Sequence, residues 1–220
     1  MLAPDLPGHG ETGIRPVTFE ATVAALAAWM ESLPAPLPLL GYSQGARIAL
    51  LLALEHPELA SHLILVSGSS GISSDPVRAR RRGLDDNIAA EIEAFGVDQF
   101  LDRWLTQPLT STAAVSSTVA AWDRTVRSEN TAAGLSAALR GLGQGAYPYV
   151  GDRLVELPMP LLAVAGGRDQ KYRALAVEMA SEAPMGRAVI LEAAGHNVVL
   201  EEPHALADAV ETFLTATSGN

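Results

Sequence analysis

Cysteine is absent from this sequence of 220 residues. Its absence excludes disulfide frameworks, thiolate zinc sites, iron–sulfur clusters and a cysteine nucleophile, and it is compatible with a reducing compartment. Any nucleophile in the protein must therefore be an oxygen or a nitrogen. No clustered histidine or carboxylate pattern suggests a metal site, so neither a metal nor a cofactor is expected.

Long apolar runs are also lacking. The apolar segment from Ile48 to Leu54 ends at Glu55, and it is far shorter than the roughly 18 residues that suggest a membrane span. The first residues contain neither a basic region nor a long apolar region, so we expect no secretory signal. The sequence predicts a cytoplasmic protein without a membrane span.

Basic residues are in deficit, since 15 lysines and arginines face 25 aspartates and glutamates, for a formal net charge of −10. An acidic chain is a poor general ligand for nucleic acid. A local group of arginines can still attract an anionic small molecule, and this is the partner we expect. The sequence does not indicate an oligomeric state.

Strand patterns alternate with helix patterns near both ends of the chain. Four short apolar runs bounded by turn residues predict strands at 37–40, 63–67, 161–165 and 188–191. Helical periodicity predicts helices at 18–33, 46–54, 174–180 and 203–214, the first with Thr18 as its N-cap. This alternation is typical of an α/β protein with a mostly parallel sheet.

The middle of the chain, residues 72–149, has hardly any strand signal. It is rich in Arg, Ala, Leu and Glu, and Asp75 and Pro76 are suited to begin a helix. We therefore expect a helical cap inserted between two strands of the sheet. The expected domains are 1–71 as the first part of the core, 72–150 as the cap, and 151–220 as the second part of the core.

Gly8, Gly10 and Gly13 match the pattern G-x-G-x-x-G of dinucleotide-binding turns. A phosphate site of that kind needs the third glycine in the first turn of a helix. Here Pro16 intervenes and helical periodicity begins only near Thr18, so a loop is the better interpretation.

A G-x-S-x-G pentapeptide, Gly41 to Gly45, lies directly between a predicted strand and a predicted helix. In a nucleophile elbow, small residues flank a tight turn that exposes the serine hydroxyl, here that of Ser43. The amide of the next residue, Gln44, can then donate to a developing oxyanion. The alternative is a chance glycine–serine turn, which the strand–turn–helix context disfavours.

A nucleophilic serine needs a histidine to take its proton and an acid to hold that histidine. Asp169 and His196 each follow a predicted strand, in the chain order that the elbow requires. A solvated turn aspartate is the alternative for Asp169. The remaining histidines are expected on the surface or in loops: His9, His56, His62 and His204.

At this point the sequence resembles the α/β-hydrolase superfamily, and within it the family of 2-succinyl-6-hydroxy-2,4-cyclohexadiene-1-carboxylate synthases of menaquinone biosynthesis. The resemblance rests on the segments Asp5–Gly10, Gly41–Arg47, Arg78–Asp85, Trp104–Leu109, Val126–Ser128 and Gly167–Leu175. It implies a lyase that eliminates pyruvate, with Ser43, His196 and Asp169 acting together as the base. No cofactor is implied.

The resemblance also implies a set of substrate-binding residues: Tyr42, Arg47, Arg78, Arg81, Trp104, Arg127 and Lys171. Spacing alone puts Arg47 one helical turn beyond Ser43 and Lys171 two residues after Asp169. Arginine forks suit a substrate that carries several carboxylates. Taken singly, each arginine is more often a solvated charge, and Trp104 and Tyr42 can equally be packing residues.

The chain departs from the superfamily pattern at its beginning. It is expected to start at the end of the fourth strand of that fold, so the earlier strands and the loop that supplies a second oxyanion donor are missing, which a late start codon would explain. Two other functions stay open on the sequence. One is a serine hydrolase of ester or C–C bonds, and the other is an inactive remnant or binding protein.

Overall fold

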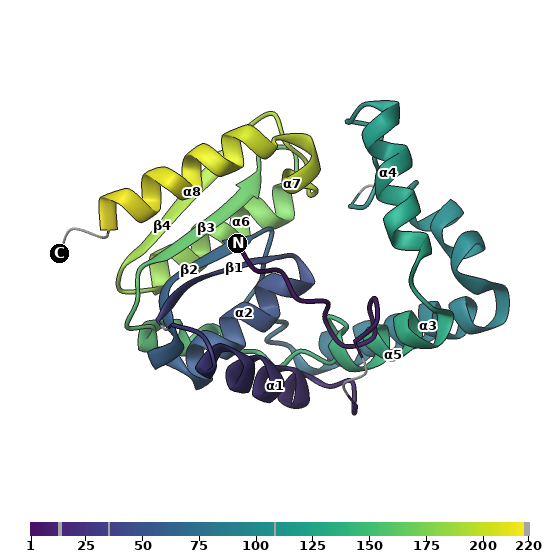
Figure 1. The fold of residues 1–220 in the computed structure, drawn as a ribbon, viewed down its shortest axis with the longest axis horizontal. Coiled ribbons are helices and arrows are strands. Elements are labelled where there is room, and N and C mark those ends of the chain that lie inside the picture. Colours follow the sequence, from purple (N-terminus) through teal and green to yellow (C-terminus); the bar gives the residue numbers. More distant parts are fainter. Residues whose placement is uncertain (13–14, 35, 108, 218–220) are drawn as a thin grey trace. The chain divides into compact units, whose positions relative to one another are not determined.

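Two compact units make up the computed structural model, which describes residues 1–12, 15–34, 36–107 and 109–217 (Figure 1). The first, the helical unit, comprises Met1–Ala25 and Ile72–Pro148. The second, the sheet unit, comprises Leu26–Gly71 and Tyr149–Asn220. The expected boundary after residue 71 coincides with a boundary between the units, but residues 1–25, expected in the core, group with the helical unit.

The sheet unit contains four parallel strands in the order β1-β2-β3-β4. Their bounds are β1 Leu37–Tyr42, β2 Ala60–Val66, β3 Leu161–Gly166 and β4 Gly186–Leu191. The helices and 3-10 turns of this unit are α2 Gln44–Glu55, η1 Pro57–Leu59, η2 Gly151–Glu156, α6 Gln170–Glu182, α7 Val198–Glu201 and α8 Pro203–Thr217. The predicted parallel α/β sheet is confirmed.

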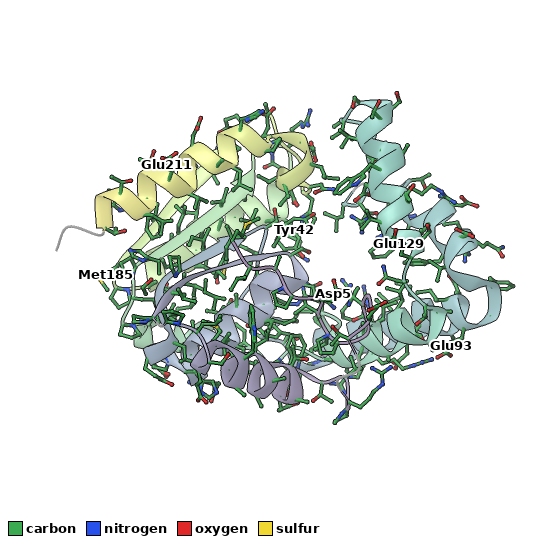
Figure 2. The ribbon with its side chains drawn as sticks, in the orientation of Figure 1. Asp5, Tyr42, Glu93, Glu129, Met185 and Glu211 are labelled. Carbon is green, nitrogen blue, oxygen red and sulfur yellow. The ribbon has the colours of Figure 1, made fainter. Side chains whose placement is uncertain are left out.

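Both faces of this sheet are covered, which is why β2 and β3 are almost continuously apolar. On one face, α8 packs against the strands through a cluster that includes Ile64, Val66, Leu162, Val164, Leu206 and Phe213. Right-handed crossovers put α2 and α6 together on the other face, and Figure 1 shows α2 and α8 on opposite sides. Glu211, labelled in Figure 2, lies on the exposed side of α8.

The helical unit confirms the expected insertion between β2 and β3. It contains α3 Asp75–Trp104, α4 Ser117–Ser128 and α5 Ala132–Leu142. The first of these begins at Asp75, as the sequence predicts. Gly96 interrupts α3 with φ 81°, a left-handed conformation that glycine adopts at little cost.

The N-terminal segment packs against α5, and this explains why it groups with the helical unit. A Cβ on Gly8 would lie 2.5 Å from the carbonyl oxygen of Gly134, and the amide of Gly10 donates to Asn130 Oδ1 at 3.0 Å. Gly8 and Gly10 lie in a turn with positive φ, which confirms the loop interpretation for these two. Gly13 lies outside the described residues.

Helix α1 runs from Phe19 to Glu31 and so belongs partly to each unit. The Thr18 hydroxyl accepts the amide of Ala21 at 3.2 Å. This bond satisfies one of the free N–H groups of the first turn. The predicted N-cap is therefore confirmed.

Strand β1 is an edge strand of the described sheet, and Leu40 on it is 48% exposed. No strand precedes β1 in the ranges that the structure describes. The expectation that earlier strands of the fold are missing from this chain stays a prediction. None of the described helices is both long and apolar enough to cross a membrane.

Candidate active site

Ser43 lies in a sharp turn between β1 and α2, where it adopts φ 50° and ψ −104°. A positive φ is strained for a residue with a side chain, and such strain is found at nucleophile elbows. The turn brings β1 so close to α2 that a Cβ on Gly41 would lie 2.2 Å from the Gly45 carbonyl oxygen. Gly45 differs, since a Cβ there meets no atom within 4 Å. Only the first glycine is therefore sterically required.

The structure brings Ser43, His196 and Asp169 together at the carboxyl ends of the parallel strands. The Ser43 hydroxyl lies 3.2 Å from His196 Nε2, and His196 Nδ1 lies 2.8 Å from Asp169 Oδ2. Ser43 follows β1, Asp169 follows β3 and His196 follows β4. The side chains of His196 and Asp169 are only 6% and 7% exposed. This is the geometry of a proton relay ending on a serine.

The ionisation state of Asp169 determines which nitrogen of His196 carries the proton. Burial raises the pKa of the Asp169 carboxyl group. Hydrogen bonds from His196 and the Tyr172 amide, together with the charges of His196 and Lys171, lower this pKa by more than burial raises it. The net pKa is below the usual value, so Asp169 is a carboxylate that only accepts hydrogen bonds. His196 must therefore donate from Nδ1, which leaves Nε2 to accept the Ser43 proton.

Other groups hold the imidazole in place. The Ser67 hydroxyl donates to the His196 carbonyl oxygen at 2.9 Å. The Tyr172 ring packs on the imidazole with a centroid distance of 4.4 Å, and the Tyr42 ring lies 5.8 Å away. Tyr42, labelled in Figure 2, is the last residue of β1. These contacts restrict the imidazole to the orientation that meets both Ser43 and Asp169.

Three other predicted residues belong to the same unit as this relay. Gln44 is the first residue of α2, at the end where the helix dipole is positive. Arg47 follows one turn later and is buried, with 6% exposure. Lys171 lies in the first turn of α6, and its ammonium is 5.2 Å from the centroid of the Tyr172 ring.

Two predicted arginines of the helical unit are held by buried aspartates of their own helices. Arg81 donates from Nε to Asp85 at 2.8 Å and from Nη1 to Gln144 at 2.7 Å. Arg127 donates from Nε to Asp123 at 2.7 Å. The aspartate side chains are 2% and 9% exposed, whereas those of Arg81 and Arg127 are 34% and 35% exposed. Each guanidinium is thus held by a carboxylate, while about a third of each arginine side chain stays exposed.

The other two predicted residues of the helical unit make mainly local contacts. Arg78 forms an ion pair with Asp75 and donates to the Ile72 carbonyl oxygen at 2.8 Å, so it supports the start of α3. Trp104 packs against Phe100, with ring centroids 5.1 Å apart, and remains partly exposed. The substrate-binding roles of both residues stay predictions.

One of the remaining histidines departs from expectation. His62 lies inside β2, is 9% exposed and packs edge-on against Phe213, so its prediction as a surface or loop residue is wrong. The cause is that β2 begins at Ala60, three residues earlier than predicted. His9 lies in the expected loop, where burial lowers its pKa. Within the described ranges no group of three or more His, Asp or Glu side chains forms a metal-binding cluster.

Sequence motifs do not reveal the residues that hold the predicted ones. Asp85 and Asp123 are four positions from the arginines that they bind, and this i,i+4 spacing is a signal that the sequence contains. Ser67 and Tyr172 reach His196 from distant parts of the chain. No local pattern marks these two contacts.

The fold and the site together define the class of protein. The family model described as "Alpha/beta hydrolase family" matches residues 1–209, and the chain belongs to this family. The expected fold is thereby confirmed.

The relatives are more specific. A Bacillus subtilis (strain 168) protein, provisionally named as a 2-succinyl-6-hydroxy-2,4-cyclohexadiene-1-carboxylate synthase, is 32% identical over 98% of this chain and 81% of its own. The synthase of that name from Salmonella heidelberg (strain SL476) is 30% identical, over 96% of this chain and 81% of its own. The structure of MenH from S. aureus matches with a TM-score of 0.93 and 29% identity, covering 98% of this chain and 83% of that one.

Proposed function

We propose that this chain is a lyase of menaquinone biosynthesis. Its substrate would be 2-succinyl-5-enolpyruvyl-6-hydroxy-3-cyclohexene-1-carboxylate, from which it would release pyruvate to give 2-succinyl-6-hydroxy-2,4-cyclohexadiene-1-carboxylate. The observation that carries the proposal is the likeness to synthases of this name over 96% to 98% of the chain. The cytoplasmic location predicted from the sequence is part of the proposal.

The relay between Asp169, His196 and Ser43 supports this chemistry. His196 takes the Ser43 proton at Nε2, and the resulting alkoxide removes a carbon-bound proton from the substrate. A carbon–carbon double bond forms as the bond to the enolpyruvyl oxygen breaks. The departing pyruvate enolate takes up the proton from His196, which returns the relay to its starting state.

Each of the two units contains cations that suit this substrate, which carries several carboxylates. In the sheet unit, Arg47 is a buried cation one helical turn from Ser43, and Gln44 offers the first amide of α2 to the charge that develops on the enolate. In the helical unit, Arg81 and Arg127 each present a guanidinium already fixed by an aspartate. A fixed guanidinium loses less entropy when it binds a carboxylate.

The experiment is to incubate the purified protein with the enolpyruvyl substrate and to follow pyruvate with lactate dehydrogenase and NADH. We expect steady pyruvate release that is lost in Ser43→Ala and kept in Ser181→Ala, which removes an exposed serine hydroxyl on α6. A folded protein that releases no pyruvate would contradict the proposal. Turnover of a chromogenic ester without pyruvate release would instead favour a serine hydrolase.

A further inference from the structure

A carboxylate outside the relay lies beside both of the loops that carry Asp169 and His196. It belongs to Glu201, the last residue of the short helix α7, five residues beyond His196. The Glu201 side chain is only 8% exposed. A charged group with so little access to water requires compensating partners within the protein.

Glu201 has two such partners, and both bind the same oxygen. The backbone amide of Gly195 donates to Oε2 at 2.8 Å, and the Arg168 guanidinium donates to it from Nη2 at 2.5 Å. A Cβ on Gly195 would lie 3.0 Å from Glu201 Oε1, so the loop passes close to the carboxylate. Both hydrogen bonds are charge-assisted, because the acceptor is a carboxylate.

These partners directly precede the two relay residues in the chain. Gly195 is followed by His196, and Arg168 is followed by Asp169. The two loops also meet through the Arg168 amide, which donates to the Ala194 carbonyl oxygen at 3.0 Å. Glu201 adds a side-chain link to that backbone bond.

We propose that Glu201 is a positioning residue that holds the loops of Asp169 and His196 in register, so that the 2.8 Å bond between Nδ1 and Oδ2 is maintained. The inference rests on the proposed use of Ser43, His196 and Asp169 as a catalytic relay. Glu201 acts through the backbone of its neighbours and does not itself transfer a proton. Since a displacement of about 1 Å at a reacting group can cost 10²-fold in rate, a link of this kind matters for turnover.

A nearby ion pair provides a matched control. Arg173 of α6 donates to Glu192 Oε2 at 3.0 Å, and Glu192 lies just after β4 in the same loop as His196. The Glu192 side chain is 68% exposed, however, so this ion pair lies on the surface. Removing Glu192 therefore takes away an acidic residue of the same loop without removing a bond to Gly195 or Arg168.

The test compares Glu201→Ala, Glu201→Gln and Glu192→Ala. We expect Glu201→Ala to lower kcat by about 10²-fold with KM nearly unchanged. Glu201→Gln should recover part of this loss, because an amide oxygen can still accept the Gly195 amide. Glu192→Ala should keep the parent kcat. Circular dichroism melting identifies which variants are folded at the assay temperature.

Two further readouts do not depend on the identity of the substrate. The rate at which a fluorophosphonate labels Ser43 should fall in parallel with kcat, and the NMR signal of the His196 Nδ1 proton should broaden in Glu201→Ala but not in Glu192→Ala. A parent protein that is labelled at Ser43 but releases no pyruvate would contradict the proposed lyase function, while these readouts would still decide the role of Glu201.

The proposal is overturned if folded Glu201→Ala is labelled as fast as the parent with a sharp Nδ1 signal. It is equally overturned if Glu192→Ala loses as much activity as Glu201→Ala. If Glu201→Ala does not fold, Arg168→Ala removes the ion pair with Glu201 instead. The Arg168 side chain is 56% exposed, so its loss disturbs the packing less. Unchanged labelling and an unchanged Nδ1 signal in that variant would refute the proposal.

Discussion

The two glycines of the elbow are expected to respond oppositely to substitution by alanine. A Cβ on Gly41 would lie 2.2 Å from the Gly45 carbonyl oxygen and 2.6 Å from the Ala46 amide nitrogen. These are backbone atoms of the first turn of α2, so no side-chain rotation relieves the overlap. Strand β1 and helix α2 would have to move apart. Overpacking of this kind costs about 2–3 kcal/mol, which for a chain of this size lowers Tm by roughly 4–12 °C.

Gly45→Ala lacks this cost, because a Cβ at Gly45 meets no atom within 4 Å and the residue has no positive φ. Alanine is also favoured over glycine in a helix by about 0.5–1 kcal/mol. We therefore expect Tm to rise by roughly 1–4 °C. Gly41→Ala should in addition lower kcat, since it displaces the turn that carries Ser43.

The assay is thermal unfolding followed by circular dichroism at equal protein concentration, with pyruvate release measured on the same samples. A Gly41→Ala variant that melts with the parent would refute the steric argument. So would a Gly45→Ala variant destabilised as strongly as Gly41→Ala, because a Cβ meets backbone atoms only at Gly41, the glycine of β1, and not at Gly45, the glycine of α2.

Three further predictions follow from the charged groups. Asp169→Asn is expected to lower kcat by about 10⁴-fold, because an amide does not fix the Nδ1-protonated tautomer of the histidine; a loss below tenfold in steady-state kinetics would contradict this role. Asp85→Asn should raise KM by about tenfold with little change in kcat, because Arg81 loses the charge that orients it; an unchanged KM would show that this ion pair does not serve substrate binding. The Arg140 guanidinium, with help from the Ser136 hydroxyl, lowers the pKa of Glu93 from 4.5 to about 2. The stability that the Glu93–Arg140 pair supplies is therefore complete above about pH 4.5 and is lost as the pH falls toward 2. Urea unfolding between pH 2 and 6 should show a weaker pH dependence in Glu93→Gln, and identical profiles would contradict the assignment.

The sheet could be predicted because its strands are short apolar runs that end at turn residues. The run at 161–165, for example, becomes β3 Leu161–Gly166 with every residue buried. Strand ends are harder to predict from the sequence, because pairing with a neighbour extends a strand beyond its apolar part. Strand β2 begins at Ala60 since Ala60 pairs with Leu37 of β1. This longer pairing is also what buries His62.

The grouping of residues 1–25 with the helical unit was not predictable from local patterns. It depends on the close approach of Gly8 to the backbone of α5 and on the bond between Gly10 and Asn130, which are 120 positions apart in the chain. Glycine in a loop is compatible with many conformations. The sequence therefore indicates a turn at these positions but not the element against which the turn packs.

The relay residues themselves could be predicted because each has a local signal, namely the elbow around Ser43 and the strand ends before Asp169 and His196. The residues that support them mostly have none. Ser67 reaches the His196 carbonyl oxygen across 129 positions, and Glu201 is defined by its burial and its two partners. Such contacts arise from packing of the folded chain and are invisible to spacing rules.

The central claim is that Ser43 and His196 act as one catalytic unit in pyruvate release. The most direct measurement is kcat for Ser43→Ala, His196→Ala and the double variant, each shown to be folded. Residues of one relay give strongly non-additive losses, so the account predicts that either single substitution costs about as much as both together. Losses that multiply in the double variant, or a single variant with parent-like turnover, would contradict the account.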